Sequence, residues 1–281
     1  MIFRPLTFFS LVLIFCSCQS KPEEKIEIPL PDFVSVSAGK YSVGRKGHHI
    51  NPKREVELES FEISTTEITN TQWEAFIQAT NYKTDAEKFK NAQSFYPGLD
   101  EFEWVSDTTA YWRFPFGVSG GGIEDKMNHP VSCISFRDVM VYCEWAGVRL
   151  PTLDEWEVAC RAGTDSHQFF GQNESDINQY GNIWQSKRHK EVTVEEDYLY
   201  TSPVASYKAN PWGLYDVYGN VFEFCGDKPE KKKDKSKIAF ARGGSWWCSR
   251  NSCNYFNSYD IGSVSIYASF PNQGFRVVKI N

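Results

Sequence analysis

The chain has 281 residues and a formal net charge of −6, with 30 Lys and Arg against 36 Asp and Glu. Nucleic-acid binding depends on clustered basic side chains, and the only basic block is the KKKDKSK run at 231–237, which is typical of a solvated loop. We therefore expect no nucleic-acid partner. With 41% hydrophobic and 23% charged residues, the composition is that of a globular protein and excludes a disordered one.

Aromatic residues are unusually frequent. The chain holds 9 Trp, 14 Tyr and 21 Phe, which make up 16% of its residues, but only 3 Met. A core built from so many rings favours short elements and turns over long helices rich in Leu and Met. The composition therefore argues against a helix bundle.

The N-terminus predicts export. An apolar run from Leu6 to Phe15 follows Arg4 and is too short to span a bilayer, so residues 1–17 are predicted to be a signal peptide. Ser17–Cys18 after this run resembles a bacterial lipobox, which predicts cleavage before Cys18 and lipidation of its thiol; an ordinary signal peptide cleaved nearby is the alternative. The polar, proline-marked segment 18–32 is predicted to be a tether. We expect a lipid-anchored protein of the bacterial cell envelope, where disulfides can form.

In chain order, the first elements expected after the tether are short. Alternating residues around Gly predict a hairpin over 34–44, and a clean alternation over 56–63 predicts a half-buried strand. Residues 69–80 begin with cap-type side chains and place their apolar residues on one face, which predicts a helix. Residues 91–128 have no period and are expected to form a long irregular segment, a kind that is usually functional in a compact domain.

Two more helices and one strand are expected in the second half of the chain. Residues 135–146 form an amphipathic pattern that stops at Gly147, and residues 152–161 begin with a capping-box pattern and end before Gly163. The segment 274–280 is predicted to be a strand. Few helices, many short strands and much irregular chain predict a single α+β domain over 33–281.

Several motifs together resemble the formylglycine-generating enzymes, also called sulfatase-modifying factors. They are HPVSCISFRD (129–138), VYCEWAGVRLPTLDEWEVACRAG (141–163), GNIWQ (181–185), WGLYDVYGNVFEF (212–224), ARGGSW (241–246) and GFR (274–276). The resemblance implies a loop-rich domain related to the C-type lectin-like fold. The same superfamily includes iron-dependent sulfoxide synthases and non-catalytic lectin-like proteins, so these motifs imply the fold and leave the activity open.

Two features resemble the formylglycine-generating branch in particular. One is TNYKTDAEKF (80–89), and the other is GGSWWCSRNSC (243–253), which contains Cys248 and Cys253. Soft thiolates select Cu(I), whereas two cysteines five apart in an exported protein commonly form a disulfide, and such a copper pair can also oxidise to one. The resemblance implies that Cys248 and Cys253 are copper ligands and that Ser245 is a polar group beside them.

The activity that the resemblance implies is oxidation of a cysteine to Cα-formylglycine in exported sulfatases, with copper and O2. Substrates would be unfolded sulfatase polypeptides carrying a Cys-x-Pro-x-Arg motif, and the enzyme is expected to be a monomer. The alternative is a non-catalytic, lectin-like surface lipoprotein that binds protein or glycan. Iron-dependent chemistry is disfavoured, because the five His form no HxxH or HExxH cluster.

This sequence departs from the family pattern around the cysteine pair. Ser249 and Ser252 stand where the family tends to have His and Tyr, and Asn257 stands at an Arg position. The segment 112–117 reads WRFPFG and lacks a His and a Glu that the family carries. We expect these changes to affect the substrate preference and the reaction rate.

The remaining cysteines divide into two groups. Cys143 and Cys160 lie on the apolar sides of predicted helices and are expected to be buried free thiols. The resemblance implies a disulfide between Cys133 and Cys225, because relatives often carry both.

The resemblance also implies two structural Ca²⁺ ions, and oxygen ligands spaced along loops suit this hard cation. One set of matching positions is Asp216, Gly219, Val221 and Glu223. The other is Asn182, Ile183 and Asp197. For single carboxylates in such loops, a solvated surface position is the alternative.

Overall fold

The computed structural model describes residues 28–171, 173–186, 188–191, 198–232 and 236–280. The predicted signal peptide, Cys18 and most of the tether lie outside these residues. The described residues form four α-helices: α1 (Asn70–Thr80), α2 (Asp85–Phe89), α3 (Phe136–Ala146) and α4 (Leu153–Arg161). Two 3-10 turns cover Val118–Gly120 and Glu174–Gln179. Among the described helices none has the length and apolarity needed to cross a membrane.

Local sequence explains where the helices begin and end. All four α-helices start with a capping box, in which a Ser or Thr side chain accepts from a backbone N–H three residues later and an acidic or amide side chain there bonds back. Each ends in a left-handed residue, as at Gly147 after α3. The predicted helices over 69–80, 135–146 and 152–161 are confirmed, whereas α2 was not predicted.

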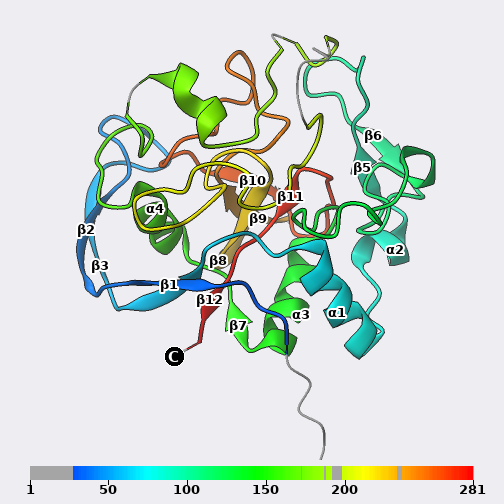
Figure 1. Cartoon of the computed structure of the whole chain (residues 1–281), viewed down its shortest axis with the longest axis horizontal. Coiled ribbons are helices and arrows are strands. Elements are labelled where there is room, and N and C mark those ends of the chain that lie inside the picture. The colour runs from blue at the N-terminus through cyan, green and yellow to red at the C-terminus, as the bar shows by residue number, and fades with distance from the viewer. Residues whose placement is uncertain (1–27, 172, 187, 192–197, 233–235, 281) are drawn as a thin grey trace, which may run out of the picture.

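Two four-stranded sheets and two ribbons form the rest of the regular structure (Figure 1). The first sheet has the order β1 (Phe33–Val36), β4 (Phe61–Ser64), β12 (Val278–Lys279) and β7 (Val148–Arg149). The second has the order β10 (Gly262–Ser265), β9 (Lys237–Arg242), β8 (Phe222–Lys231) and β11 (Gln273–Gly274). The ribbons pair β2 (Gly39–Val43) with β3 (Arg54–Leu58), and β5 (Ala92–Ser94) with β6 (Val105–Asp107). The expectation of a loop-rich α+β chain is confirmed.

Three strand predictions are wrong because the pairing is non-local. The segment 34–44 forms no hairpin, since β1 pairs with β4 and β2 pairs with β3. The segment 56–63 is divided between β3 and β4, which belong to different sheets. The segment 274–280 is likewise divided between β11 and β12. An alternating pattern gives the burial of a strand but does not identify its partner.

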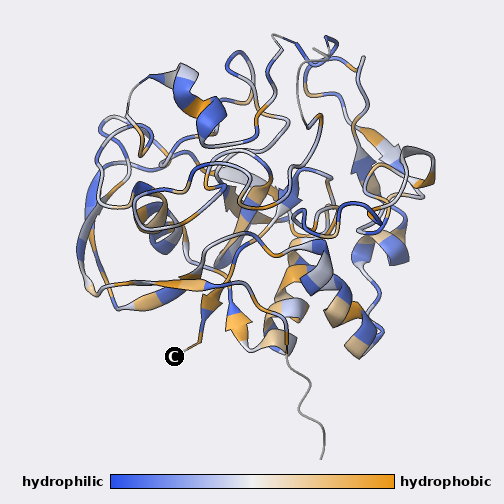
Figure 2. Cartoon of the chain, in the orientation of Figure 1, coloured by the Kyte–Doolittle hydropathy of each residue, from blue (hydrophilic) through white to orange (hydrophobic). Residues whose placement is uncertain are grey.

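Aromatic rings fill two main cores. Figure 2 shows hydrophobic residues along the β8–β9 hairpin and on α3, which contribute to these cores. In one, α1 packs on α3, and Trp73 stacks on Tyr142 with ring centroids 5.5 Å apart. In the other, α4 packs on the β8–β9 hairpin, with Trp156 and Tyr218 fully buried. The expectation of a ring-based core is confirmed. A smaller aromatic cluster packs against Cys253, which also contacts the second core.

Two buried ion pairs connect the C-terminal half of the chain to earlier segments. Arg276 binds both carboxylate oxygens of Glu223 and also donates to the backbone carbonyl of Ser64. Arg242 binds Glu157 at 3.0 Å, and both side chains are fully buried. Because an unpaired buried charge is costly, these pairs fix the position of β8 and β9 relative to α4 and to the N-terminal strands.

Candidate active site

Two glycines turn the chain out of β9 and into the cysteine-containing loop. Gly243 and Gly244 both have positive φ, and a Cβ on Gly244 would lie 3.0 Å from the backbone N of Phe256. Glycine is therefore required for this close approach. After the turn, residues Ser245 to Ser249 are buried, whereas Arg250 and Asn251 are exposed.

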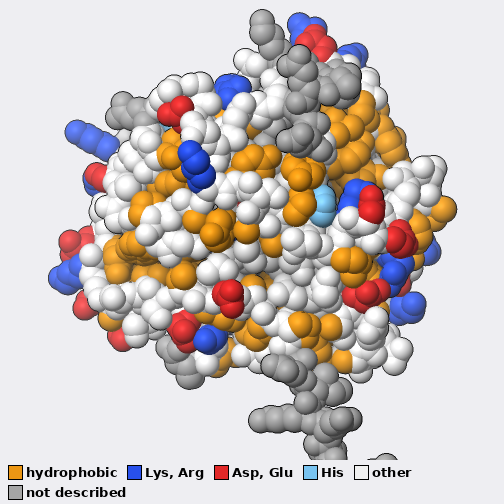
Figure 3. Space-filling model, in the orientation of Figure 1, with side chains coloured by type: hydrophobic (Ala, Val, Ile, Leu, Met, Phe, Trp, Pro, Cys, Tyr) orange, Lys and Arg blue, Asp and Glu red, His pale blue; other side chains and the backbone are white. Residues whose placement is uncertain are grey.

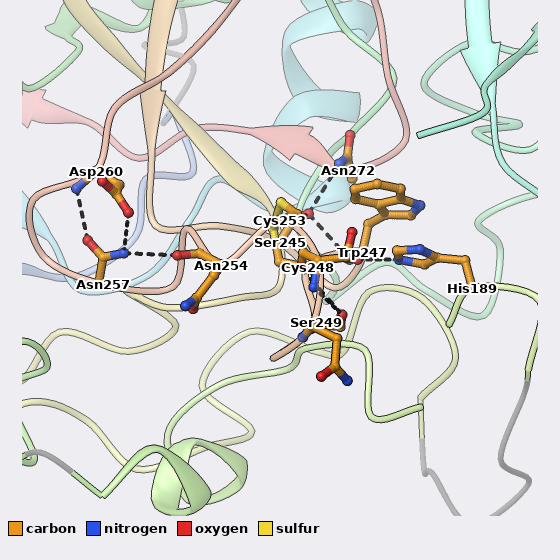
Figure 4. Close-up of a disulfide and its surroundings, with 12 residues drawn as sticks. His189, Ser245, Trp247, Cys248, Ser249, Cys253, Asn254, Asn257, Asp260 and Asn272 are labelled. Atoms are coloured by element: carbon orange, nitrogen blue, oxygen red, sulfur yellow. Dashed lines mark hydrogen bonds between the residues drawn. A yellow bond between two sulfur atoms is a disulfide. The ribbon is translucent and has the colours of Figure 1, made fainter. Parts of the chain in front are cut away.

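Cys248 and Cys253 are joined by a disulfide, with Cα atoms 4.7 Å apart (Figure 4). Cys248 is fully buried, whereas Cys253 is partly exposed. The two sulfurs are therefore brought together, with access from the side of Cys253. This is the oxidised form of the pair that the sequence predicts, and reduction would leave two soft sulfur donors side by side, the donor type that Cu(I) prefers.

Ser245 lies beside the sulfur of Cys248. Its Oγ is 3.9 Å from Cys248 Sγ, and it accepts from Asn272 Nδ2 at 3.1 Å and from the backbone N–H of Trp247 at 3.3 Å. Asn272 comes from the turn before β11 and was not predicted from the sequence. The structure thus confirms the proximity of Ser245 to the cysteine pair.

His189 holds the backbone just before Cys248. Its Nε2 is 2.6 Å from the carbonyl oxygen of Trp247, and its Nδ1 is 2.5 Å from a carboxylate oxygen of Glu101. A carbonyl oxygen can only accept, so Nε2 donates to Trp247, and Nδ1 lies within hydrogen-bond distance of Glu101. The ring also stacks on the Trp247 indole, with centroids 4.0 Å apart.

The contact with His189 changes the pKa of the Glu101 carboxyl. Burial raises the pKa of its carboxyl, but hydrogen bonds from the backbone and ring of His189 outweigh burial and hold the pKa below its usual value. Neither residue was predicted, because 91–128 and the segment after 185 have no periodic pattern. The contact brings the segment 91–128 to the cysteine loop. The prediction that this segment is wholly irregular is wrong, because it contains the paired strands β5 and β6.

The departures from the family pattern have structural roles here. Ser249 closes a tight turn, in which its Oγ accepts from the N–H of Ser252 at 3.0 Å. The amide of Asn257 donates to Asp260 at 2.7 Å and to the carbonyl of Asn254 at 3.1 Å, on the side away from the thiols (Figure 4). The hydrogen bonds of these side chains shape the loops around the pair.

Aromatic side chains surround the site. Phe95, Trp184, Trp246 and Trp247 form one buried cluster. Phe116, from the segment 112–117, stacks on Tyr200 beside that cluster, with ring centroids 3.9 Å apart. Hydrophobic side chains also gather at the surface near β5 and β6, in the upper right of Figure 3. Apolar side chains therefore border both sulfurs, Cys253 in the aromatic cluster and Cys248 in the second core.

The first predicted calcium segment lies in an irregular loop with backbone φ positive at Asp216, Gly219 and Asn220. Asp216 is buried, and one of its carboxylate oxygens has no hydrogen-bond partner. Glu67, which was not predicted, is fully buried with both carboxylate oxygens unpartnered. Burial and the nearby carboxylates of Asp216 and Glu223 raise the pKa of Glu67 well above its usual value.

Burying carboxylate oxygens without a partner is unfavourable, and a hard cation such as Ca²⁺ would provide a partner for these oxygens. Within the described residues no three His, Cys, Asp or Glu gather as a metal site, so a cation here would also draw on backbone or solvent oxygens. The Glu223 carboxylate already accepts from Arg276 and Trp156. Glu67 and Asp216 therefore fit Ca²⁺ better than Glu223 does, while the roles of Gly219 and Val221 stay predictions.

The second predicted calcium segment is adjacent to the first. The carbonyl of Asn182 accepts from the N–H of Asn220 at 2.8 Å, and the Asn182 amide donates to the carbonyl of Tyr200. Ile183 is buried, and Asp197 lies outside the described residues. This ligand set remains a prediction.

The predicted Cys133–Cys225 disulfide is wrong. Both are buried free thiols, and they belong to separate clusters, Cys133 with Ala86 and Ala92 and Cys225 in the core of α4. Burial raises the pKa of both. The prediction of free buried thiols at Cys143 and Cys160 is confirmed, and burial raises their pKa values to about 12.

Residues 18–280 match the family model of the sulfatase-modifying factor enzyme 1-like domain. The chain belongs to the sulfatase-modifying factor family. Within this family it is 35% identical over 256 residues to the formylglycine-generating enzyme of Thermomonospora curvata, covering 80% of this chain and 84% of the relative. It is 31% identical over 284 residues to the mouse formylglycine-generating enzyme, covering 89% and 75%.

The family also contains inactive members. The chain is 33% identical over 217 residues to the bovine inactive C-alpha-formylglycine-generating enzyme 2, covering 72% of this chain and 70% of the relative. Among solved structures, PvdO from Pseudomonas aeruginosa superposes with a TM-score of 0.65 at 21% identity, covering 89% of this chain and 95% of that one. Treponema denticola variable protein 1 gives 0.59 at 19%, covering 88% and 94%. These two structures support the fold alone.

Proposed function

We propose that this protein oxidises a cysteine of exported sulfatases to Cα-formylglycine, using Cu(I) and O2. The observation that carries the proposal is the Cys248–Cys253 pair, buried at one sulfur and accessible at the other, with Ser245 beside it. Its similarity to enzymes named formylglycine-generating over most of the chain supports the same reaction.

Residues of the chain hold the two sulfurs in position and set their surroundings. In the reduced pair, Cys248 and Cys253 are held as soft donors by a loop whose carbonyls are bound by Trp184 and His189. When bound there, Cu(I) supplies the redox chemistry that activates O2. Burial of Cys248 keeps water from its sulfur, and the substrate cysteine approaches on the side of the partly exposed Cys253.

The surroundings of the protein follow from the same proposal. A lipid on Cys18 would tether the domain to the cell envelope, where unfolded Cys-x-Pro-x-Arg segments emerge from the membrane. Ca²⁺ at Glu67 and Asp216 would stabilise the loop-rich fold without entering the reaction. We propose that the protein works as a monomer.

The alternative function is a non-catalytic, lectin-like surface lipoprotein that binds protein or glycan. The turn-forming roles of Ser249 and Asn257 and the similarity to a relative named inactive favour it. In that case the Cys248–Cys253 disulfide would be purely structural.

Copper binding separates the two functions. The reduced mature chain is titrated with Cu(I) in competition with a chromophoric chelator, and conversion of a Cys-x-Pro-x-Arg peptide is followed under air with a thiol reductant. We expect one Cu(I) bound per chain, and none in the Cys248→Ser or Cys253→Ser variant. Absence of both binding and conversion would support the lectin-like function.

A further inference from the structure

A large polar pocket lies beside the cysteine loop. It has a volume of about 770 Å³ and is lined by three segments: the loop between β2 and β3, the end of α4 with the turn after it, and the chain from Asn254 to Asp260. Asn254 directly follows Cys253 in the chain, and Figure 4 shows Asn254 between the disulfide and Asp260. The pocket and the reactive sulfurs therefore share one loop.

The lining carries an excess of positive charge on a chain whose net charge is negative. Four of its residues are cationic, namely Arg45, Lys46, Lys53 and Arg161. The two acidic lining residues are already engaged: Asp165 binds Lys53 at 2.7 Å, and Asp260 accepts from Asn257 and lies 2.9 Å from a ring nitrogen of His48. Arg161 is neutralised from beneath by buried Glu157 at 2.8 Å.

Arg45 and Lys46 remain without a carboxylate partner among the described residues, and both are exposed. Arg45 is nevertheless held in place, because its guanidinium donates to the hydroxyl of Tyr259 and lies over that ring at 4.9 Å. The Tyr259 hydroxyl also bonds to His167 at 2.6 Å. A preorganised cation at the mouth of a pocket attracts an anionic group.

We propose that this pocket binds an acidic segment of the substrate polypeptide, next to its target cysteine. The proposal rests on the proposed function, which brings a polypeptide to Cys253. An extended chain advances about 3.3–3.6 Å per residue, so a substrate held at the sulfurs reaches the pocket within a few residues. Its volume is in the range of sites that hold ligands larger than a single ion, which favours side chains of a peptide over free sulfate or phosphate.

The test is a binding measurement that needs neither copper nor turnover. Fluorescein-labelled peptides carry Ser-x-Pro-x-Arg in place of the reactive motif, flanked on either side by Asp and Glu, or by Asn and Gln in matched neutral controls. Fluorescence anisotropy with the full mature chain should show about tenfold tighter binding of one acidic peptide at low salt, and the preference should fall in high salt.

Charge-reversal variants test whether Arg45 and Lys46 cause the preference for acidic peptides. The double variant Arg45→Glu/Lys46→Glu should abolish the acidic preference, whereas Lys228→Glu/Lys231→Glu, with the same change of charge in the exposed β8–β9 hairpin, should keep it. Melting temperatures confirm that both variants fold. Equal binding of acidic and neutral peptides would overturn the proposal, and so would equal losses in the two variants.

The outcomes also separate this proposal from the proposed function. Conversion of the Cys-x-Pro-x-Arg peptide without any acidic preference overturns the pocket assignment alone. An acidic preference that depends on Arg45 and Lys46 supports it, even if no peptide is converted. Inorganic sulfate that binds while acidic and neutral peptides stay equivalent also overturns it, because the pocket would then be a simple anion site.

Discussion

His189 contacts Trp247 twice: its Nε2 donates to the Trp247 carbonyl at 2.6 Å, and its ring stacks on the indole of the same residue. Trp247 directly precedes Cys248, so this contact fixes the peptide that carries the buried sulfur. Glu101 completes the contact from the other side of the ring. A segment without regular structure thus positions the candidate active site.

Replacing His189 tests this positioning role. His189→Phe keeps a ring for stacking but leaves the buried Trp247 carbonyl without a donor, so the free energy of unfolding should fall by about 1–3 kcal/mol. Peptide conversion should slow while Cu(I) still binds. Glu101→Gln, which retains an acceptor for Nδ1, should have the smaller effect, and unchanged urea unfolding of His189→Phe would contradict the assignment.

Glu157 is predicted to be essential to the fold around the polar pocket. Its carboxylate accepts from Arg242, Arg161, Asn51 and the N–H of Gly44. Glu157→Ala leaves buried arginines unpaired and should cost about 3–5 kcal/mol in urea unfolding. Asp154→Ala is a control on the exposed side of the same helix, where a surface ion pair contributes little. Similar losses in the two variants would argue against the buried pairing.

Calcium should stabilise the chain through Glu67 and Asp216. Adding Ca²⁺ to chelator-treated protein should raise the melting temperature, because the cation supplies the partner that three buried carboxylate oxygens lack. Glu67→Gln should reduce this rise and should make the calcium-free chain more stable than the parent, since it removes a buried charge. A rise of the same size in the variant would exclude Glu67 as a ligand.

The stability of the chelator-treated chain should fall as the pH rises, because of Asp216. Burial raises the pKa of Asp216 from 3.8 to about 6, so its folded state holds a proton that the unfolded chain has already released. The stability that it contributes is present below pH 3.8 and is lost as pH rises through about 6. Melting temperatures in chelator should show this loss across that window, and Asp216→Asn should flatten it.

Thiol counting tests the corrected disulfide assignment. The denatured mature chain, without reductant, should react with four equivalents of a thiol reagent, from Cys133, Cys143, Cys160 and Cys225. Reduction should expose two more, from Cys248 and Cys253. Lipidated Cys18 should not react. A count of two thiols before reduction would show that a second disulfide is present and would contradict the assignment.

Prediction from the sequence succeeded where structure is local. Thr69, Ser135 and Thr152 cap helices through bonds to residues three positions away, so a short window contains the whole signal. Strand pairing is not local: Val278 pairs with both Ile63 and Arg149, and no pattern in any of the three segments names its partners. The hairpin and long-strand predictions failed for that reason.

The residues of the candidate site likewise fall into those with a local sequence signal and those brought together only by the fold. The motif around Cys248 identified the sulfur pair and Ser245, which lie within one short loop. Glu67 and His189 are single residues in segments without a period, and their roles arise only when the fold buries them beside distant groups. Sequence alone gave no signal for either.

Formylglycine formation is tested by mass spectrometry of a Cys-x-Pro-x-Arg peptide incubated with the reduced chain, Cu(I), O2 and a thiol reductant. We predict the mass decrease that accompanies replacement of CH2SH by an aldehyde CHO, together with capture by an aldehyde-reactive hydroxylamine. The Cys253→Ser variant should give no product. A copper-loaded, folded chain that leaves this peptide unchanged would contradict the proposed function.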